Sequence, residues 1–315
     1  MQEMDDHSFG GGWTEIKLKA LSEYLQFYTA ALQSQPTLEN AFQTWYVDAF
    51  AGSGRRTTHV EVGGIFTDEP SRVETRMLDG SARKALAVMP HFQHCVFIEQ
   101  NLRRFRALEK MKSEFPSRSI KVVRGDANVE LRAIFEAPPW LQGTANSRLQ
   151  RSVVFLDPYG INVSWSTMEL LASTQRVDVW YLLNIAAVNR QLARDLANVD
   201  EHKVRRLNEV FGTADWKDDL YQSLPRQSDL FGGYDAERKR RMVETRDIEA
   251  YARTRLGRLF NYVSDPIPLM IKKRPHFSLL CLSNNPSPRA IDLIKKGVKH
   301  VVEKYGQASH HRFGR

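Results

Sequence analysis

The sequence predicts an α/β fold in which a mostly parallel sheet is covered by helices on both faces. Two observations carry this prediction. Short runs rich in β-branched and aromatic residues alternate with amphipathic segments of helical length from about residue 45 to residue 183. These runs are mostly apolar, which is typical of strands buried on both faces of a parallel sheet. The length of 315 residues and the hydrophobic content of 42% suit one large α/β domain with insertions or two small domains.

The first elements precede the regular alternation. A helix is expected from Thr14, which can cap it, to about Leu32, because apolar residues recur at helical spacing between them. The first strand is expected at 45–47. The polar segment 55–77 predicts a long loop or a hairpin insertion, and Ser81 is expected to cap the next helix.

Strands and helices then alternate along the chain. The strands are expected at 95–99, 120–124, 153–156 and 177–183. The helices are expected at 102–115, 127–135 and 167–173, with a polar loop at 138–150. After the fifth strand a charged, helical stretch interrupts the pattern. The final elements are expected to be a helix at 247–260, strands near 261–267 and 277–282, and a helix at 289–304.

These elements predict four parts of the chain. An N-terminal helix and a Rossmann-like core occupy residues 1–186, and a helical insertion that caps or flanks the site occupies 187–246. Residues 247–305 return to the core with the last helices and two strands. Residues 306–315 are expected to be a flexible tail.

Composition excludes several classes of protein. No apolar run is long enough to cross a bilayer, and the N-terminus lacks the basic start of a secretory signal, so we expect a cytoplasmic protein with no membrane partner. Cys95 and Cys281 each lie in an apolar run and are interpreted as buried thiols in a reducing compartment. The histidines and cysteines show no metal-ligand spacing, and we expect no metal.

The chain is basic, with 45 Lys and Arg against 37 Asp and Glu, and its formal net charge is +8. Basic clusters occur at 55–56, 103–106, 205–206, 238–241 and 272–274. One such cluster is usually a solvated helix face. Five of them favour a polyanion, because neutralised phosphates supply most of the nonspecific affinity for nucleic acid. We therefore expect nucleic acid as a partner.

A glycine-rich turn follows the first strand, in the run Asp48-Ala49-Phe50-Ala51-Gly52-Ser53-Gly54. Gly52 and Gly54 offer backbone without Cβ to a ligand at a strand-to-helix crossover. A dinucleotide fingerprint would need a third glycine where Thr57 stands, and the chain has no Gly-Lys-Ser/Thr phosphate loop. A lone Gly-x-Gly can also be only a tight turn.

Acidic residues close the following strands. Glu99 can hold the two ribose hydroxyls of a nucleoside, and Asp126 can accept a hydrogen bond from an adenine amine. Ala127, next to Asp126, is grouped with the cofactor-binding candidates. Ligands of parallel sheets bind outside the carboxyl ends of the strands, where Asp48, Glu99, Asp126 and Asp157 are all expected. Each acid could instead merely cap the following helix.

The fourth acid opens the run Asp157-Pro158-Tyr159-Gly160. The exocyclic amine of a purine is a poor nucleophile, because its lone pair is delocalised into the ring. The Asp157 carboxylate and the Pro158 carbonyl can accept the two amine hydrogens and so localise this lone pair, while Tyr159 can stack on the base. The same four residues can also form a plain turn. Together these features suggest methyl transfer from S-adenosylmethionine to a nucleobase amine.

Two further residues are candidates for substrate binding. Asn189 and Arg190 come just after the fifth strand and could orient a base or a phosphate. Equally, Asn189 could cap the following helix and Arg190 could be a surface charge.

Both site motifs resemble known sequences. The run from Asp48 to Gly54 resembles the DPFxGSG motif of amino-methyltransferases, with Ala49 where they usually have proline. Asp157-Pro158-Tyr159 resembles their (D/N)PP(Y/F) element, with one proline missing and Gly160 following. Asp-Pro-Tyr-Gly is closer to the Asp-Pro-Phe-Gly of transfer-RNA guanine dimethyltransferases, which would favour a guanine amine.

Over nearly its whole length the chain is most similar to the three-Cys-motif partner protein family (TcmP). The similarity rests on the FAGSG turn, Asp79-Gly80-Ser81, Phe97-Ile98-Glu99, Phe155 to Gly160 with Trp165, Asn189-Arg190 and Ser283-Asn284-Asn285-Pro286. The resemblance implies a Rossmann-like class I methyltransferase fold with a mostly parallel seven-stranded sheet, helices on both faces and a helical insertion. The family is encoded in bacteria and phages beside a radical-SAM-like protein with a three-cysteine motif, which would be a possible partner.

Three functions follow from these observations. The first is a methyltransferase that uses S-adenosylmethionine and acts on an exocyclic nucleobase amine in DNA or RNA. The second is a catalytically silent, methyltransferase-like scaffold of the three-cysteine-motif protein; four retained strand-end acids argue against it. The third is nucleotide hydrolysis or nuclease activity, against which the absent phosphate loop and metal-carboxylate cluster count.

Overall fold

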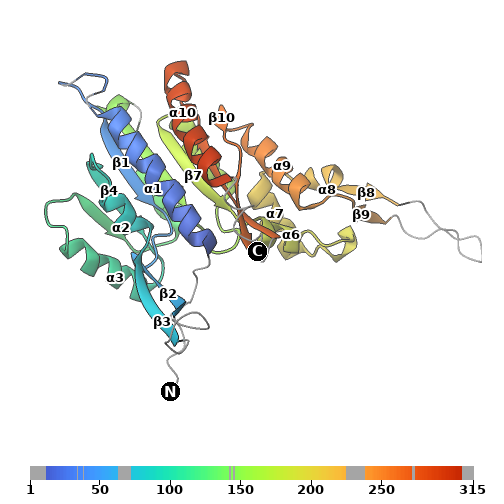
Figure 1. Cartoon of the computed structure of the whole chain (residues 1–315). Coiled ribbons are helices and arrows are strands. Elements are labelled where there is room, and N and C mark those ends of the chain that lie inside the picture. The colour runs from blue at the N-terminus through green and yellow to red at the C-terminus, as the bar shows by residue number, and fades with distance from the viewer. Residues whose placement is uncertain are drawn as a thin grey trace, which may run out of the picture. The chain divides into compact units, whose positions relative to one another are not determined.

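The structure is a computed structural model that describes residues 12–33, 35–37, 39–62, 72–141, 143–144, 146–224, 238–271 and 274–306; at 56–62 and 72–77 it describes only the backbone. The chain divides into two compact units (Figure 1). The first runs to Phe155 and resumes at Ile294, and the second spans Leu156–Leu293. The tail expected at 306–315 lies outside the described residues, except for Gly306 at the end of the last helix.

The elements of the first unit follow the predicted order. Its helices are α1 (Gly12–Leu32), α2 (Ser81–Leu86), α3 (Leu102–Ser113) and α4 (Ala127–Phe135), together with most of α10 (Pro288–Gly306). Its strands are β1 (Gln43–Asp48), β2 (Arg55–Val62), β3 (Arg72–Asp79), β4 (His94–Ile98), β5 (Ile120–Val123) and β6 (Gln150–Leu156), the last of which ends at the boundary; a 3₁₀ turn, η1 (Ser147–Leu149), precedes β6.

Four of these strands form a parallel sheet in the order β6-β1-β4-β5. In order of appearance along the chain this is 4-1-2-3. Read from the other edge, 3-2-1-4, it is the first half of the doubly wound Rossmann arrangement together with the first strand of its second half. The strands form around runs of buried apolar residues; Tyr46, Val47, Phe97 and Phe155 have no exposed surface. The segment 55–77, for which a loop or a hairpin was predicted, is the antiparallel hairpin β2-β3.

Helix α10 returns to the first unit and packs against α1, as Figure 1 shows. Gly297 makes this contact possible, because a Cβ there would lie 2.4 Å from the ring of Phe27. At the end of α10, Tyr305 donates a hydrogen bond of 2.6 Å to Glu23, and Lys304 forms an ion pair of 2.5 Å with the same carboxylate. These contacts join helices near the two ends of the sequence, since Glu23 and Tyr305 are 282 positions apart.

The second unit contains helices α5 (Trp165–Ser173), α6 (Ile185–Gln191), α7 (Glu201–Phe211), α8 (Trp216–Asp219) and α9 (Thr245–Leu256), and the 3₁₀ turn η2 (Leu196–Asn198). Its strands are β7 (Val177–Leu183), β8 (Tyr221–Ser223), β9 (Lys239–Arg241), β10 (Tyr262–Val263), β11 (Ile267–Ile271) and β12 (Arg274–Ser283). Every residue of β7 is buried. Strand β12 runs antiparallel to β7, β10 and β11, and β8 pairs with β9 in a separate small sheet.

The observed topology confirms the predicted fold class, a mostly parallel, Rossmann-like α/β sheet. Four local predictions were wrong. Thr14 does not cap the first helix, because α1 already includes Gly12 and Trp13 and Thr14 is buried inside it. The described part of the sheet has eight strands and not the expected seven, because β11 adds to β12. Ser81 does not cap α2: the N-cap is Gly80, whose backbone donates to Gly54, so no side chain caps this helix. The single strand expected near 261–267 is two short strands, β10 and β11, because the chain turns between them and β11 forms a hairpin with β12.

Candidate cofactor and substrate site

The carboxyl ends of the four parallel strands define the candidate site. Asp48 is the last residue of β1 and pairs in register with Phe97 of β4 and Phe155 of β6. Glu99 follows β4 directly, and its N–H donates a hydrogen bond of 3.0 Å to the carbonyl of Val123, the last residue of β5. Because the strands are parallel, these ends lie on one edge of the sheet.

Glu99 links the glycine-rich turn to the start of α3. Its side chain is buried, with 6% of its surface exposed. One carboxylate oxygen, Oε2, accepts a hydrogen bond of 3.0 Å from the N–H of Gly52, and the other, Oε1, accepts one of 2.8 Å from the N–H of Asn101. A carboxylate has about four acceptor positions, so each oxygen retains capacity for a hydroxyl donor. Glu99 therefore fixes the turn while remaining a possible acceptor.

The two glycines of the turn have different surroundings. Both have positive φ, +64° at Gly52 and +74° at Gly54, a region that favours glycine. A Cβ on Gly52 would meet no described atom within 4 Å, whereas one on Gly54 would lie 2.7 Å from the sulfur of Met111 in α3. A side chain at Gly54 would therefore displace Met111, whereas Gly52 leaves open space that a ligand could enter.

Asp48 is fully buried. Its Oδ1 accepts a hydrogen bond of 3.2 Å from the N–H of Phe50, and its Oδ2 accepts one of 3.3 Å from the hydroxyl of Tyr46. The half-buried Phe50 is thereby held at the beginning of the turn. Asp48 shapes the backbone of the turn and presents no surface to a ligand.

Asp126 caps α4, which is the alternative to ligand binding that the sequence left open for each strand-end acid. Both capping bonds, from Asn128 at 2.9 Å and Val129 at 3.3 Å, go to the same oxygen, Oδ1. The side chain is exposed, and Ala127 behind it is buried at the first position of the helix. The second oxygen of Asp126 is free of any described protein donor and can accept a hydrogen bond from a ligand.

The residues present fit an adenosyl ligand by their donor and acceptor chemistry. Glu99 offers a buried carboxylate beside the open position at Gly52, and Asp126 offers an exposed carboxylate oxygen at the next strand end. Hydroxyl and amine donors are what such oxygens accept. No large side chain fills the space in front of Gly52 among the described atoms.

The Asp157 segment follows β6 without a break. Asp157 is half-buried, Pro158 is buried and the side chain of Tyr159 is 55% exposed. Gly160 has a φ of +76°, which turns the chain away after the aromatic ring. An exposed tyrosine beside a carboxylate that is still accessible is an arrangement that can receive a flat, polar ring.

Asn189 and Arg190 occupy the last turn of α6. The N-cap of this helix is Asn184, whose side chain accepts from Ala187 at 2.9 Å, so Asn189 does not cap it. Instead, both the side-chain and backbone oxygens of Asn189 accept hydrogen bonds from Arg241 of β9. Arg190 is exposed. Asn189 thus positions a basic strand, a role that its place in the sequence does not indicate.

Other predictions concern groups away from this edge. Both cysteines are buried free thiols, as predicted, and burial raises the pKa of Cys95 to about 12, which makes it unreactive as a nucleophile at neutral pH. Within the described ranges, no three His, Cys, Asp or Glu side chains come together in a way that could hold a metal ion. Among the described helices none combines the length and the apolar character needed to span a bilayer.

Sequence reasoning missed several contributors. Tyr46 and Asn101 hold Asp48 and Glu99, but neither belongs to a motif: Tyr46 is one aromatic in an apolar strand, and Asn101 is one polar residue before a helix. The position of Asn101 ahead of an amphipathic segment does predict an N-cap, which it is, through bonds to Arg103 and Arg104.

No protein-family model matches the chain, and no curated protein matches it. Among solved structures it is similar to protein LPL1258 from Legionella pneumophila, with 13% identity over 95% of this chain and 94% of that one and a TM-score of 0.41. A putative methyltransferase, yhhF, from Escherichia coli has 14% identity over 71% and 86%, with a TM-score of 0.31. A S-adenosylmethionine-dependent methyltransferase from Clostridium acetobutylicum has 11% identity over 84% and 91%, with a TM-score of 0.35. These scores are low, so the fold rests on the strand order and register of the chain itself.

Proposed function

We propose that the protein is an S-adenosylmethionine-dependent methyltransferase that acts on an exocyclic amine of a nucleobase in DNA or RNA. The observation that carries the proposal is the Glu99 carboxylate, buried between the N–H groups of Gly52 and Asn101 and next to the open position of the turn. A buried acid at this strand end, held by backbone donors, is arranged to accept the hydroxyls of a ribose.

The other residues of the first unit divide the remaining work. Gly52 admits the methionine part of the cofactor, and Gly54 keeps the turn packed on α3. Asp126 accepts from the adenine amine through the oxygen that does not cap α4, with Ala127 at its back. Asp48 and Phe50 act indirectly, by fixing the course of the turn.

When bound, S-adenosylmethionine supplies a methyl group on a positively charged sulfur, which is a good leaving group. The protein then has to orient and activate the acceptor. Asp157 and the carbonyl of Pro158 accept the two amine hydrogens, which localises the nitrogen lone pair, and Tyr159 stacks on the base. Orientation of this kind contributes up to about 7–11 kcal/mol to the lowering of a barrier.

The basic character of the chain supports a nucleic-acid substrate. In this proposal Arg190, which is exposed on α6, contacts a phosphate. The resemblance of the sequence motifs to those of TcmP proteins would add a three-cysteine-motif protein as a proposed partner. In the scaffold alternative that protein would perform the chemistry, and this chain would not bind S-adenosylmethionine.

Two measurements test the proposal. Nucleosides from cells that express the wild type or Asp157→Ala are compared by mass spectrometry; we expect a methylated nucleoside with the wild type alone. Calorimetry should give nearly equal affinities of both proteins for S-adenosylmethionine. Unchanged methylation in Asp157→Ala would refute the role of that residue, and absence of heat with the wild type would favour the scaffold.

A further inference from the structure

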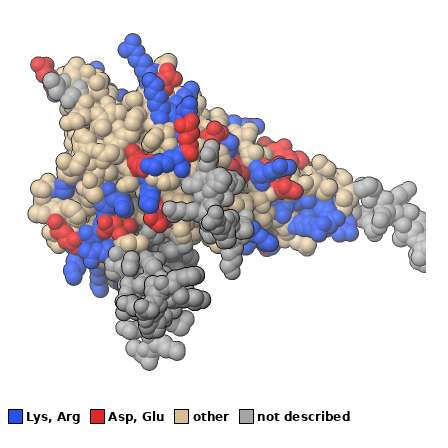
Figure 2. Space-filling model, in the orientation of Figure 1, with Lys and Arg blue, Asp and Glu red and all other residues tan. Residues whose placement is uncertain are grey.

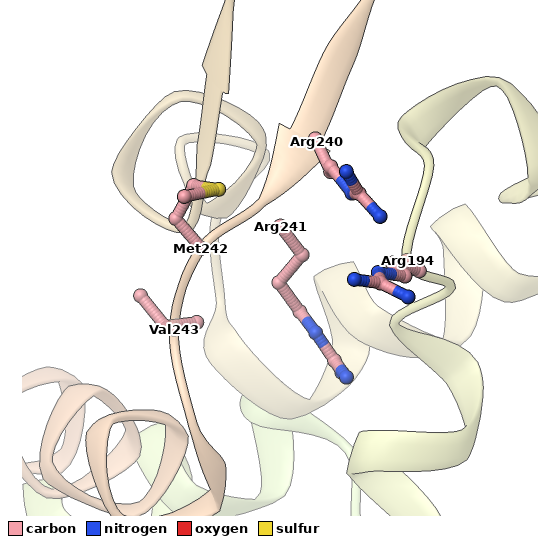
Figure 3. A pocket seen from close by; sticks show the side chains of 5 residues that line it. All are labelled: Arg194, Arg240, Arg241, Met242 and Val243. Atoms are coloured by element: carbon pink, nitrogen blue, oxygen red, sulfur yellow. The ribbon is translucent and has the colours of Figure 1, made fainter.

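A basic pocket lies in the second unit, at the junction of β9 with the loop that follows α6. It has a volume of about 310 Å³ and is lined by Arg194, Arg240, Arg241, Met242 and Val243 (Figure 3). This volume is at the lower end of the range for small-molecule sites. Figure 2 shows Lys and Arg side chains gathered over the end of the unit that carries β8 and β9.

Arg241 forms the fixed part of the pocket. Its guanidinium donates hydrogen bonds to both oxygens of Asn189 and, with a length of 2.8 Å, to the carbonyl of Leu192. Its backbone N–H donates a hydrogen bond of 2.8 Å to the carbonyl of Arg194. These bonds join β9 to the end of α6 and hold the Arg194 backbone beside the strand. The pocket is therefore built by the fold rather than by a chance meeting of surface side chains.

Arg194 and Arg240 are not neutralised by an ion pair within the described part of the chain. The nearest candidate is Asp195, whose backbone bridges to that of Arg240. Its carboxylate is engaged elsewhere, by an ion pair of 2.9 Å with Arg238 and a bond of 3.4 Å from the N–H of Ala197. The bond from Arg238 lowers the pKa of Asp195, with smaller contributions from Arg238 and Arg240 through their charges.

Figure 3 shows the guanidinium groups of Arg194 and Arg240 directed toward the same space. The nearby Asp195 carboxylate acts on Arg240 only through its charge, because its ion pair is with Arg238. Like charges repel, so the convergence of Arg194 and Arg240 costs free energy that a bound anion would offset. Arginine presents a planar fork of donors that matches phosphate oxygens in a bidentate manner.

The opposite wall of the pocket is apolar. Met242 is 59% exposed at the edge of the pocket, and Val243 lies beside it. A methionine thioether makes favourable contacts with aromatic rings. A ligand with an anionic group and a flat ring close to it would satisfy both walls.

We propose that this pocket binds one phosphate group of the nucleic-acid strand, with the adjoining base or sugar against Met242. The class of the ligand, nucleic acid, rests on the proposed function. The pocket itself is a second contact surface for that substrate, remote in sequence from the strand-end acids. Arg194 and Arg240 bind the phosphate, and Arg241 keeps them in place.

The test measures the binding of the full chain to a fluorescein-labelled thymidine dodecamer and a uridine dodecamer by fluorescence anisotropy, at several salt concentrations. The pocket variant is Arg194→Gln with Arg240→Gln. Its matched control is Arg246→Gln with Arg258→Gln, two exposed arginines of the same unit outside the pocket. Arg241 is left intact because it holds the backbone together.

We expect the pocket variant to bind about tenfold more weakly than the wild type, as for the loss of charge-assisted hydrogen bonds. The slope of log affinity against log salt should fall in magnitude by about 0.7, the value for one phosphate contact on a single strand. Met242→Ala should weaken binding without changing the slope. The control pair should change affinity and slope much less.

Equal changes in the pocket and control variants would overturn the proposal, because they would indicate only a general effect of charge. Absence of oligonucleotide binding by the wild type would overturn it as well. Thermal unfolding of each variant shows whether the fold is intact. Failure of the methyltransferase proposal is recognised separately, by calorimetry with S-adenosylmethionine, which does not involve this pocket. A preference for one of the two dodecamers would distinguish DNA from RNA.

Discussion

Replacement of Glu99 by glutamine is the most direct test of the candidate cofactor site. The wild-type carboxylate accepts a backbone hydrogen bond at each oxygen, 3.0 Å from Gly52 and 2.8 Å from Asn101. Glutamine keeps one acceptor and presents an NH₂ group to the other donor. One backbone N–H therefore loses its partner in either orientation, and the 6% exposure of the side chain leaves little room for water to replace it.

The magnitude follows from these contacts. Loss of one hydrogen bond to a charged acceptor, with a buried donor left unpaired, costs about 1.5–3 kcal/mol of unfolding free energy. In a domain of ordinary size 1 kcal/mol corresponds to about 2–4 °C, so we expect a Tm lower by roughly 4–8 °C for a loss near 2 kcal/mol. Affinity for S-adenosylmethionine should fall by tenfold or more, since the ribose hydroxyls lose a charged acceptor.

Differential scanning fluorimetry and calorimetry measure the two effects. Glu39→Gln is the matched control, since Glu39 is an exposed acid of the same unit and the chemical change is identical. A Glu99→Gln protein with the Tm and the cofactor affinity of this control would refute the reasoning. A lower Tm with an unchanged affinity for S-adenosylmethionine would mean that Glu99 stabilises the fold but does not bind the ribose.

Three further predictions concern packing and pH. Gly297→Ala should lower the Tm, because the new Cβ would lie 2.4 Å from the Phe27 ring, and the cost of about 1–3 kcal/mol outweighs the higher helix propensity of alanine. In a Phe27→Ala background the same substitution should not lower the Tm. Equal losses of Tm in both backgrounds would contradict the clash. Gly212→Ala should cost about 3 kcal/mol or more in urea unfolding, since its φ is +65° and the new Cβ would lie 2.1 Å from Trp165; an unchanged midpoint would be incompatible with this geometry. Burial raises the pKa of Glu23, but hydrogen bonds and charges from α10 outweigh it and lower the pKa, so the stability from this pair is present above the unfolded pKa and is lost as the pH falls through the folded one. The stability difference between wild type and Glu23→Gln should accordingly shrink toward acid in urea titrations, and a difference that does not depend on pH would argue against it.

Much of the fold could be predicted because local pattern and tertiary environment agree. The strands β4, β5 and β7 are apolar runs between turn residues, and the helix predicted at 127–135 is α4 with the same bounds. Where the two disagreed, the prediction failed. The cap at Ser81 followed a local rule, but the Gly80 N–H is bound to the carbonyl of Gly54, a residue distant in sequence whose position only the folded turn determines.

The site could be predicted only as far as strand ends determine it. That parallel strands end in acids identifies an edge, and Glu99 does lie against the glycine-rich turn there. Burial of Asp48 could not be foreseen, because nothing in the sequence distinguishes an acid that shapes a turn from one that faces a ligand. The role of Asn189 was equally hidden, since its partner Arg241 lies 52 positions further along the chain. Arg194 carries no motif at all.

The contrasting surroundings of the two turn glycines have an evolutionary consequence. A side chain at Gly54 would displace Met111 of α3, and the resulting loss of stability would lower the abundance of the protein in the cell. A side chain at Gly52 meets no described atom and adds only the strain of a positive φ, which both glycines share, so such a variant should be more abundant than one at Gly54 while it occupies the space open to a ligand. A library selected first for cellular abundance and then for modified nucleosides would separate the two constraints, at positions only two residues apart.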